Sequence, residues 1–148
     1  MGQAADSIDL ETSLGYLLKQ AASALRSAMD RALRPLGLTV PQYSCLEQLA
    51  QRPGVSNSDL ARGTFVTRQS MNVLLQTLER DGLITRADHA PTGRAIPVEL
   101  TAEGRARLVD ASAAVRTVEK RMHSGLDLAD QSELRRLLRD CVASLDGS

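Results

Sequence analysis

The stretch that most constrains the fold of this chain runs from residue 66 to residue 84, VTRQSMNVLLQTLERDGLI. Thr67 suits a helix N-cap, because its hydroxyl can accept a hydrogen bond from the free N–H groups of the first turn. Val66 and Met71 are spaced for a hydrophobic staple. Gly82 can adopt the positive φ that often ends a helix. The sequence therefore predicts a helix with defined ends between Thr67 and Gly82.

This predicted helix has two unlike faces. An apolar face follows the i, i+3, i+4, i+7 rule and contains Met71, Leu74, Leu75 and Leu78. The opposite face contains Gln69, Asn72, Val73, Gln76 and Arg80. Amides and arginine can read base edges in a major groove, and a valine can contact a thymine methyl. A polar face is also ordinary for a solvated helix, so this helix alone leaves both interpretations open.

Composition narrows the class of protein. The 148 residues suit one compact domain with a sizeable core. The charges balance at 18 basic and 18 acidic residues, which argues against a histone-like nucleic-acid binder but not against a local basic patch. Aromatic residues are few (Tyr16, Tyr43 and Phe65), which argues against a stacking platform for single strands. We expect a mostly helical core of Leu, Val and Ala.

Cysteine, histidine and targeting patterns add further expectations. Cys45 and Cys141 are too few for a disulfide framework, and both lie on or beside apolar helical faces, so we expect them to be buried and inert. His89 and His123 do not cluster with carboxylates, so we expect no metal and no cofactor. The sequence has neither a signal-peptide pattern nor a long apolar span, which predicts a cytoplasmic protein.

Two helices precede the opening stretch, and a third, short helix leads into it. Residues 9–34 form a long helical pattern whose apolar stripe is broad, and we expect its first half to face a partner chain. Thr39 and Gln42 form a capping box for a second helix, which stops at residues 53–54. Ser56 and Asp59 resemble another capping box. A short helix, a turn from Gly63 to Val66 and an amphipathic helix together indicate a helix-turn-helix.

The chain after Gly82 predicts a small hairpin and two more helices. Residues 83–86 and the alternation of Ile96, Val98 and Leu100 indicate two strands. Residues 88–93, DHAPTG, have turn composition, so the hairpin tip carries His89 and Arg94 and forms a wing. Thr101 caps a helix over about residues 102–123. Asp130 and Glu133 form a capping box for a last helix with a dense apolar seam.

The order of these parts resembles the multiple-antibiotic-resistance regulator (MarR) family. The similarity rests on LT at residues 38–39, LERDGLI at residues 78–84 and LTAEGR at residues 100–105, and it covers the chain from about Leu14 to Leu145. It implies a mostly α fold with a small β-hairpin wing (α+β) and a homodimeric transcriptional repressor or activator. The terminal segments, 1–38 and 102–148, would interlock in the dimer, and residues 39–101 would form the DNA-binding winged helix-turn-helix.

The resemblance also assigns expected roles to residues. The helix 67–81 would enter the major groove, and Arg94 would reach the flanking minor groove. The family commonly carries an Asp two residues before that arginine, whereas this chain has Thr92. The expected DNA contacts are Ser56, Thr67, Arg68, Gln69, Ser70, Asn72, Val73, Gln76, His89 and Arg94. The expected dimer interface contains Leu10, Leu14, Leu17, Leu134, Leu138, Val142 and Leu145.

Family members often bind small aromatic acids between the first helices and the winged region. Tyr16, Lys19, Gln20 and Tyr43 are candidates for such an effector site, although Lys19 also suits a solvated surface and Tyr43 a core position. Two other classes stay open. One is a winged helix that binds only protein, which needs neither the amide-rich face nor Arg94. The other is an enzyme, for which the sequence offers no nucleophile–base pair or phosphate loop.

Overall fold

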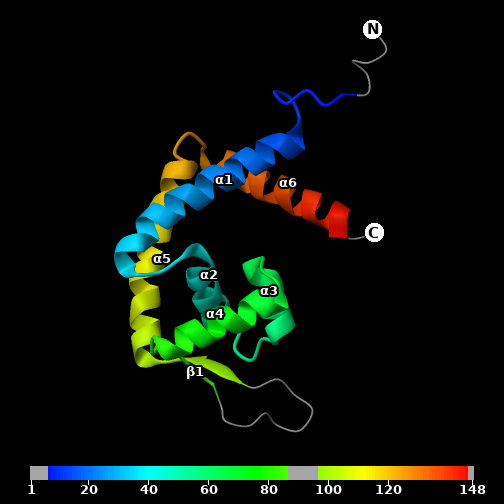
Figure 1. Cartoon of the computed structure of the whole chain (residues 1–148). Coiled ribbons are helices and arrows are strands. Elements are labelled where there is room, and N and C mark those ends of the chain that lie inside the picture. The colour runs from blue at the N-terminus through cyan, green and yellow to red at the C-terminus, as the bar shows by residue number, and fades with distance from the viewer. Residues whose placement is uncertain (1–6, 87–96, 147–148) are drawn as a thin grey trace.

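The computed structural model describes residues 7–86 and 97–146. Its elements are α1 (Leu14–Leu33), the 3-10 helix η1 (Arg34–Leu36), α2 (Val40–Gln51), α3 (Asn57–Thr64), α4 (Arg68–Arg80), β1 (Ile84–Arg86), β2 (Val98–Leu100), α5 (Ala102–Met122) and α6 (Leu128–Asp146). The two strands form an antiparallel sheet beside α4 (Figure 1). The predicted fold class, mostly helical with a small hairpin, is confirmed.

The core lies where α2, α3, α4 and the two strands meet the end of α1 and the first half of α5. Its largest fully buried side chains are Leu33, Leu46, Leu60, Met71, Leu75, Leu78, Leu83, Ile84 and Cys45. The apolar face predicted for residues 67–81 supplies three of them, and Leu74 packs against the cluster from its edge. The helix-turn-helix therefore has a continuous core within a single chain.

The segment LERDGLI (residues 78–84) packs against the segment LTAEGR (residues 100–105), and this packing holds the sheet against the start of α5. Ile84 pairs with Leu100 across the ladder. The Thr101 N–H donates to the Leu83 carbonyl at 3.1 Å, and its hydroxyl donates to the Gly82 carbonyl at 2.7 Å. A Cβ on Gly104 would lie only 2.0 Å from the Leu83 carbonyl oxygen. The close approach of α5 to β1 therefore requires glycine at position 104.

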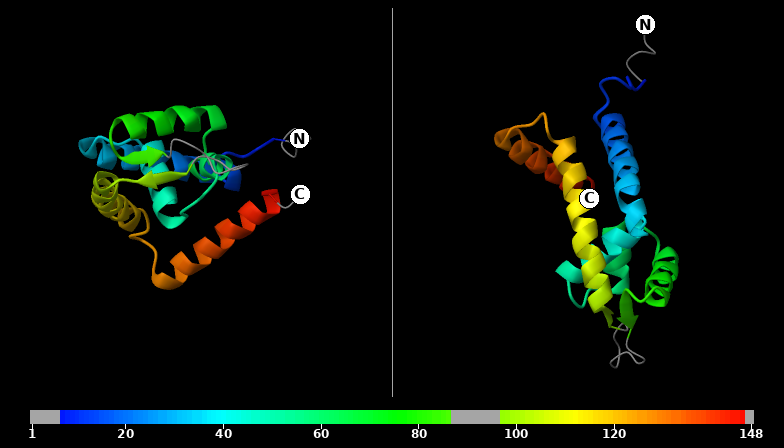
Figure 2. Two further views of the ribbon diagram at one scale, coloured as in Figure 1. Left: turned by 90° about the horizontal axis from the view of Figure 1, so that it is seen from below. Right: turned by 90° about the vertical axis from the view of Figure 1, so that its left-hand side faces the viewer.

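The terminal helices are arranged differently from this core. α1 and α5 pack along each other, and α6 turns back from the end of α5 (Figures 1 and 2). The N-terminal half of α1 extends beyond the helix-turn-helix in both figures. Only Ala28 and Leu33 of α1 are buried, and α6 buries none of its side chains. None of the helices described combines the length and apolarity that crossing a bilayer requires.

Several predicted helix boundaries are confirmed, and two are wrong. Thr39 and Gln42 form the full capping box of α2. α1 begins at Leu14 rather than near residue 9, because the Ser13 hydroxyl caps it by accepting from the Tyr16 N–H at 3.2 Å. α6 begins at Leu128, because the Asp127 carboxylate accepts from the Asp130 N–H at 2.7 Å. Asp127 therefore takes the capping role predicted for Asp130.

The turn of the helix-turn-helix is not made by Gly63. That glycine lies inside α3, and a Cβ there would come within 2.9 Å of the Gln48 side-chain amide on α2. The positive φ of the turn belongs instead to Phe65, at 61°. Gly63 therefore lies where α3 packs against α2, and the turn is confined to Phe65 and Val66, the second half of the predicted range Gly63 to Val66.

The expectation that both cysteines are buried is half right. Cys45 is fully buried in the core, and burial raises the pKa of its thiol to about 12, so it stays protonated and unreactive. Cys141 is exposed in the single chain. The apolar seam of α6 was correctly located, but nothing in the described chain covers it.

Candidate nucleic-acid interface

The outer face of α4 is exposed as the sequence predicts. Its members Gln69, Asn72, Val73, Gln76 and Arg80 are all exposed. The opposite face of the same helix is buried, so the helix cannot rotate to hide these groups. α4 thus presents three amides, a branched methyl side chain and a guanidinium on one surface, with donors, acceptors and an apolar group side by side.

The N-terminus of α4 is held by hydroxyl groups. The Thr67 hydroxyl accepts from the Ser70 N–H at 3.0 Å and donates to the Ser70 hydroxyl, also at 3.0 Å. Ser56 caps α3 in the same way, by accepting from the Asp59 N–H at 3.1 Å. The reciprocal half of the predicted capping box is replaced, because the Asp59 carboxylate pairs with Arg62 at 3.6 Å. All three predicted hydroxyl residues therefore lie at helix starts, where backbone N–H groups favour an anion.

Arg68 is fixed by a residue that the sequence analysis did not single out. Its Nε and Nη2 both donate to the Ser58 hydroxyl on α3, at 2.9 and 2.7 Å. This contact joins the first turns of α3 and α4 and holds the guanidinium beside α3. The partners are ten residues apart, so no local pattern links them, although Ser58 lies in the conspicuous run SNSD.

Of the predicted wing, the described residues include the two strands at its base, β1 and β2. An ion pair between Arg86 on β1 and Glu79 on α4, at 3.6 Å, ties the sheet to the helix. The Arg86 side chain is largely covered. The predicted tip residues His89, Thr92 and Arg94 lie outside the described residues. The sheet itself is on the same end of the molecule as α4 (Figure 1).

The four effector candidates are not brought together in one chain. The Tyr43 hydroxyl donates to Glu47 Oε2 at 2.8 Å, and the Ser112 hydroxyl on α5 donates to the same oxygen at 2.9 Å. Burial, and then Glu47, raise the pKa of Tyr43 to about 12. Tyr16, Lys19 and Gln20 are exposed in the first half of α1, about 20 to 25 Å along the helix axis from its end at Leu33. Tyr43 therefore belongs to a network joining α2 and α5.

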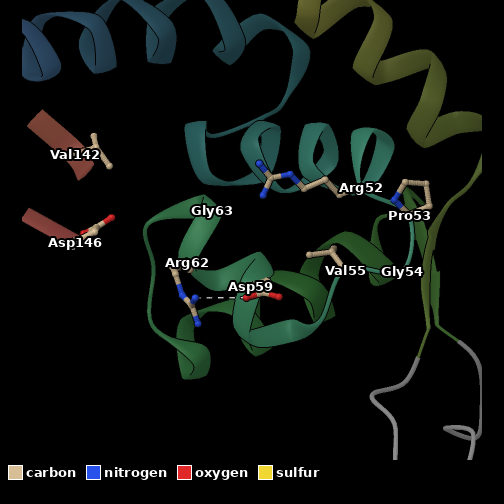
Figure 3. Close-up of a pocket in the computed structure, with 9 residues that line it drawn as sticks. All are labelled: Arg52, Pro53, Gly54, Val55, Asp59, Arg62, Gly63, Val142 and Asp146. Atoms are coloured by element: carbon tan, nitrogen blue, oxygen red, sulfur yellow. Dashed lines mark ion pairs between the residues drawn. The ribbon is translucent and has the colours of Figure 1, made fainter. Parts of the chain in front are cut away.

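Two hollows were not predicted, because their residues come from distant segments. One, of about 620 Å³, lies between the α2–α3 connection, α3 and the end of α6. Figure 3 shows Val142 and Asp146 on the α6 side, facing the Arg62–Asp59 ion pair. A second hollow, of about 350 Å³, lies between α2, β2 and α5. Of the predicted site residues in the ranges 7–86 and 97–146, only Val142 lines either hollow.

Comparison with known proteins identifies the family. The MarR family model matches residues 36–95. The HTH-type transcriptional repressor Rv2887 of Mycobacterium tuberculosis is 42% identical over 128 residues, which cover 86% of this chain and 92% of that protein. The chain belongs to the MarR family. The resemblance inferred from LT, LERDGLI and LTAEGR is thereby confirmed, and the chain is a helix-turn-helix, DNA-binding regulator of transcription.

Solved structures of the same MarR relative agree with the fold. Rv2887 crystallised with DNA is 39% identical, covers 88% of this chain and 98% of its own, and has a TM-score of 0.71. Rv2887 with salicylic acid is 42% identical, covers 88% and 96%, and has a TM-score of 0.72. Proteins of the MarR family are dimers. The relative crystallised with DNA favours a DNA-binding role over a winged helix that binds only protein.

Proposed function

We propose that this MarR-family chain is a repressor that binds a pseudo-palindromic operator as a homodimer and is released by a small aromatic acid. The proposal rests on the exposed outer face of α4, whose orientation is set by the buried apolar face on the opposite side of the same helix. Amides offer paired donors and acceptors for adenine, and Val73 offers a surface for a thymine methyl. The geometry supports Gln69, Asn72, Val73 and Gln76 as the base-reading residues.

A second group of residues is proposed to hold phosphates. Ser56, Thr67 and Ser70 lie at helix starts, where N–H groups and the helix dipole attract anions. Arg68 joins them, because its bonds to Ser58 hold the guanidinium beside α3 and leave its other N–H groups to donate to a phosphate. His89 and Arg94 are proposed as the minor-groove contacts of the wing.

The dimer is proposed to form through the terminal segments, 1–38 and 102–148, with residues 39–101 as the DNA-binding region. Support comes from the large apolar side chains that these segments leave exposed: Leu10, Leu14, Leu17, Leu134, Leu138, Val142 and Leu145. A two-fold axis through this surface would present two α4 helices to successive major grooves, about 34 Å apart. Because the protein must reach DNA, we expect it in the cytoplasm.

An aromatic acid is proposed as the effector, since the relative Rv2887 is crystallised with salicylic acid. In one chain the first turns of α1 lie away from α2, the helix that contains Tyr43 (Figures 1 and 2). A site containing Tyr16, Lys19, Gln20 and Tyr43 would therefore need α1 of the partner chain. Such a ligand would regulate by favouring a dimer whose two α4 helices are wrongly spaced for successive grooves.

The test is selection of bound fragments from the source genome, followed by titration of the enriched duplex. We expect Gln69→Ala and Asn72→Ala each to weaken binding by about tenfold, because each removes a base contact. Ser124→Ala is the control, at an exposed polar residue just beyond the end of α5 and outside every proposed site, and its affinity for the duplex should be unchanged. The wild-type affinity should fall steeply with salt. Failure of the wild type to select any duplex at low ionic strength would refute the proposal.

A further inference from the structure

Phe65, in the turn between α3 and α4, is held in an unusual way. Its backbone is in the left-handed region, with φ 61° and ψ 40°, and it is the one non-glycine residue of positive φ in residues 7–86 and 97–146. Its side chain is 92% exposed, more than any other large hydrophobic residue of those ranges. An aromatic residue is disfavoured in this backbone region, and its ring gains nothing from the core. The chain thus carries two unfavourable features at one position.

The conformation is explained by the turn, but the ring is not. The Phe65 N–H donates to the Arg62 carbonyl at 3.2 Å, and the Val66 N–H donates to the Ala61 carbonyl at 3.0 Å. These bonds close α3 and place Thr67, the N-cap of α4, two residues later. Glycine would adopt this conformation at lower cost. The turn therefore needs a left-handed residue, and something else must account for an aromatic one.

The position of Phe65 indicates what the ring is for. It lies three residues before the start of α4, whose outer face begins at Gln69, and Arg68 joins the first turns of α3 and α4. The exposed ring is thus continuous along the chain with the proposed DNA-binding surface. Val73, which is 58% exposed, is the large apolar side chain that α4 itself exposes. A flat apolar ring beside a duplex can pack on a thymine methyl or on a deoxyribose.

We propose that Phe65 is a DNA-contacting residue that packs on an apolar group at the edge of the major groove, either a thymine methyl or a deoxyribose. This inference rests on the proposed function. The strained turn aims the ring outward, and the contact with DNA provides the gain that folding alone does not. Phe65 would then contribute to affinity without neutralising any phosphate.

The test compares Phe65→Gly with Phe65→Leu on the duplex enriched by genomic selection. Phe65→Gly should raise the unfolding temperature, because glycine takes the left-handed conformation freely. The same variant should bind the duplex about tenfold more weakly, with an unchanged slope of affinity against salt, since no charge is removed. Phe65→Leu keeps an apolar group and should stay within about threefold of wild type. A rise in stability combined with a fall in affinity cannot come from misfolding.

Replacing the thymines of each half-site with deoxyuridine separates the two sources of apolar contact. If the ring packs on a methyl, deoxyuridine at one position weakens the wild type and has less effect on Phe65→Gly. If it packs on a deoxyribose, Phe65→Gly binds weakly and every deoxyuridine duplex affects both proteins equally. Unchanged affinity of Phe65→Gly would overturn the inference and leave the proposed function intact. The inference would also be overturned if sedimentation showed that Phe65→Gly weakens the dimer, because the loss of affinity would then come from dissociation of the two chains. Loss of all wild-type binding would refute the proposed function itself.

Discussion

The helix α4 and the helix α6 have similar apolar spacing but opposite surroundings. Met71, Leu75 and Leu78 on α4 are fully buried. On α6, Leu134 is 42% exposed, Leu138 is 38% exposed and Val142 is 58% exposed. Both patterns mark one face of an amphipathic helix. The helix-turn-helix closes its core within one chain, whereas none of the described residues of the same chain buries the apolar face of α6.

This difference shows what an apolar stripe can and cannot reveal. Its period fixes which side of a helix is apolar, because side chains three and four residues apart share a face. It does not say whether the covering surface belongs to the same chain or to another. The expected burial of Cys141 failed for this reason, since its helix face was located correctly but stays open in one chain. The helix-turn-helix core and the apolar face of α6 can therefore be tested by separate substitutions.

The largest expected effect is the loss of the dimer on placing a charge in the α6 seam. Leu138→Glu removes an apolar side chain and brings a carboxylate into the proposed interface twice, once from each copy. We expect a loss of about 4 kcal/mol, or roughly a thousandfold in the dimer dissociation constant. Sedimentation over a range of concentrations measures it. Val109→Glu, at an exposed valine of α5 near the sheet, is the control and should stay dimeric. A dimeric Leu138→Glu protein would place the interface elsewhere.

A slightly smaller effect is expected inside the closed core. Gly104→Ala would bring a Cβ to 2.0 Å from the Leu83 carbonyl oxygen, and the obstacle is backbone rather than a movable side chain. We expect the free energy of unfolding to fall by about 3 kcal/mol, with α5 forced away from β1. Gly125→Ala is the matched control, since a Cβ there meets nothing within 4 Å. Chemical denaturation should separate the two variants clearly. Equal stabilities would show that α5 can shift without cost.

Local sequence signals predicted the parts of the site that depend on neighbouring residues. The caps Thr39, Thr67 and Thr101 and the two faces of α4 followed from spacing alone. Asp127 was missed because the helix-start pattern fits two positions, and only the three-dimensional structure distinguishes them.

Contacts between segments that are far apart in the sequence could not be predicted from local patterns. The bond from Arg68 to Ser58 joins two helices, and the need for glycine at position 104 comes from the backbone of Leu83. A sequence pattern names a glycine, but it does not name the neighbour that makes it necessary. Phe65 illustrates the converse, because the turn was predicted correctly between Gly63 and Val66, but the pattern did not show that Phe65 rather than the glycine has the positive φ.

A moderate effect is expected from removing the cap of α4. Thr67→Ala leaves the Ser70 N–H without its acceptor, and we expect a loss of about 1 kcal/mol in unfolding free energy. Thr117→Ala is the control, because that hydroxyl bonds to the Ala113 carbonyl within its own helix and alanine favours helix. Thermal unfolding compares them. If Thr117→Ala destabilises the protein as much as Thr67→Ala, the cap has no special role.

The smallest expected effect depends on pH and concerns the link between the two regions. Burial acts to raise the pKa of Glu47, but hydrogen bonds from Gln51, Tyr43 and Ser112, together with Arg116, lower it overall. Because the folded pKa lies below the unfolded one, the carboxylate stabilises the fold above the unfolded pKa, and this contribution is lost as pH falls through the folded pKa. Glu47→Gln should therefore cost about 0.5 kcal/mol at neutral pH and progressively less in acid.

Denaturation at a series of pH values measures this effect against Glu99→Gln, an exposed carboxyl on β2 whose replacement should change little. A cost for Glu47→Gln that stays constant into acid would mean that shape, rather than charge, joins α2 to α5. The distinction matters for regulation. Ser112 is on α5, within the proposed dimerisation segment 102–148, and Tyr43 is on α2, which packs against α4. A charged link between them would make the placement of the two α4 helices sensitive to any ligand or pH change that alters Glu47.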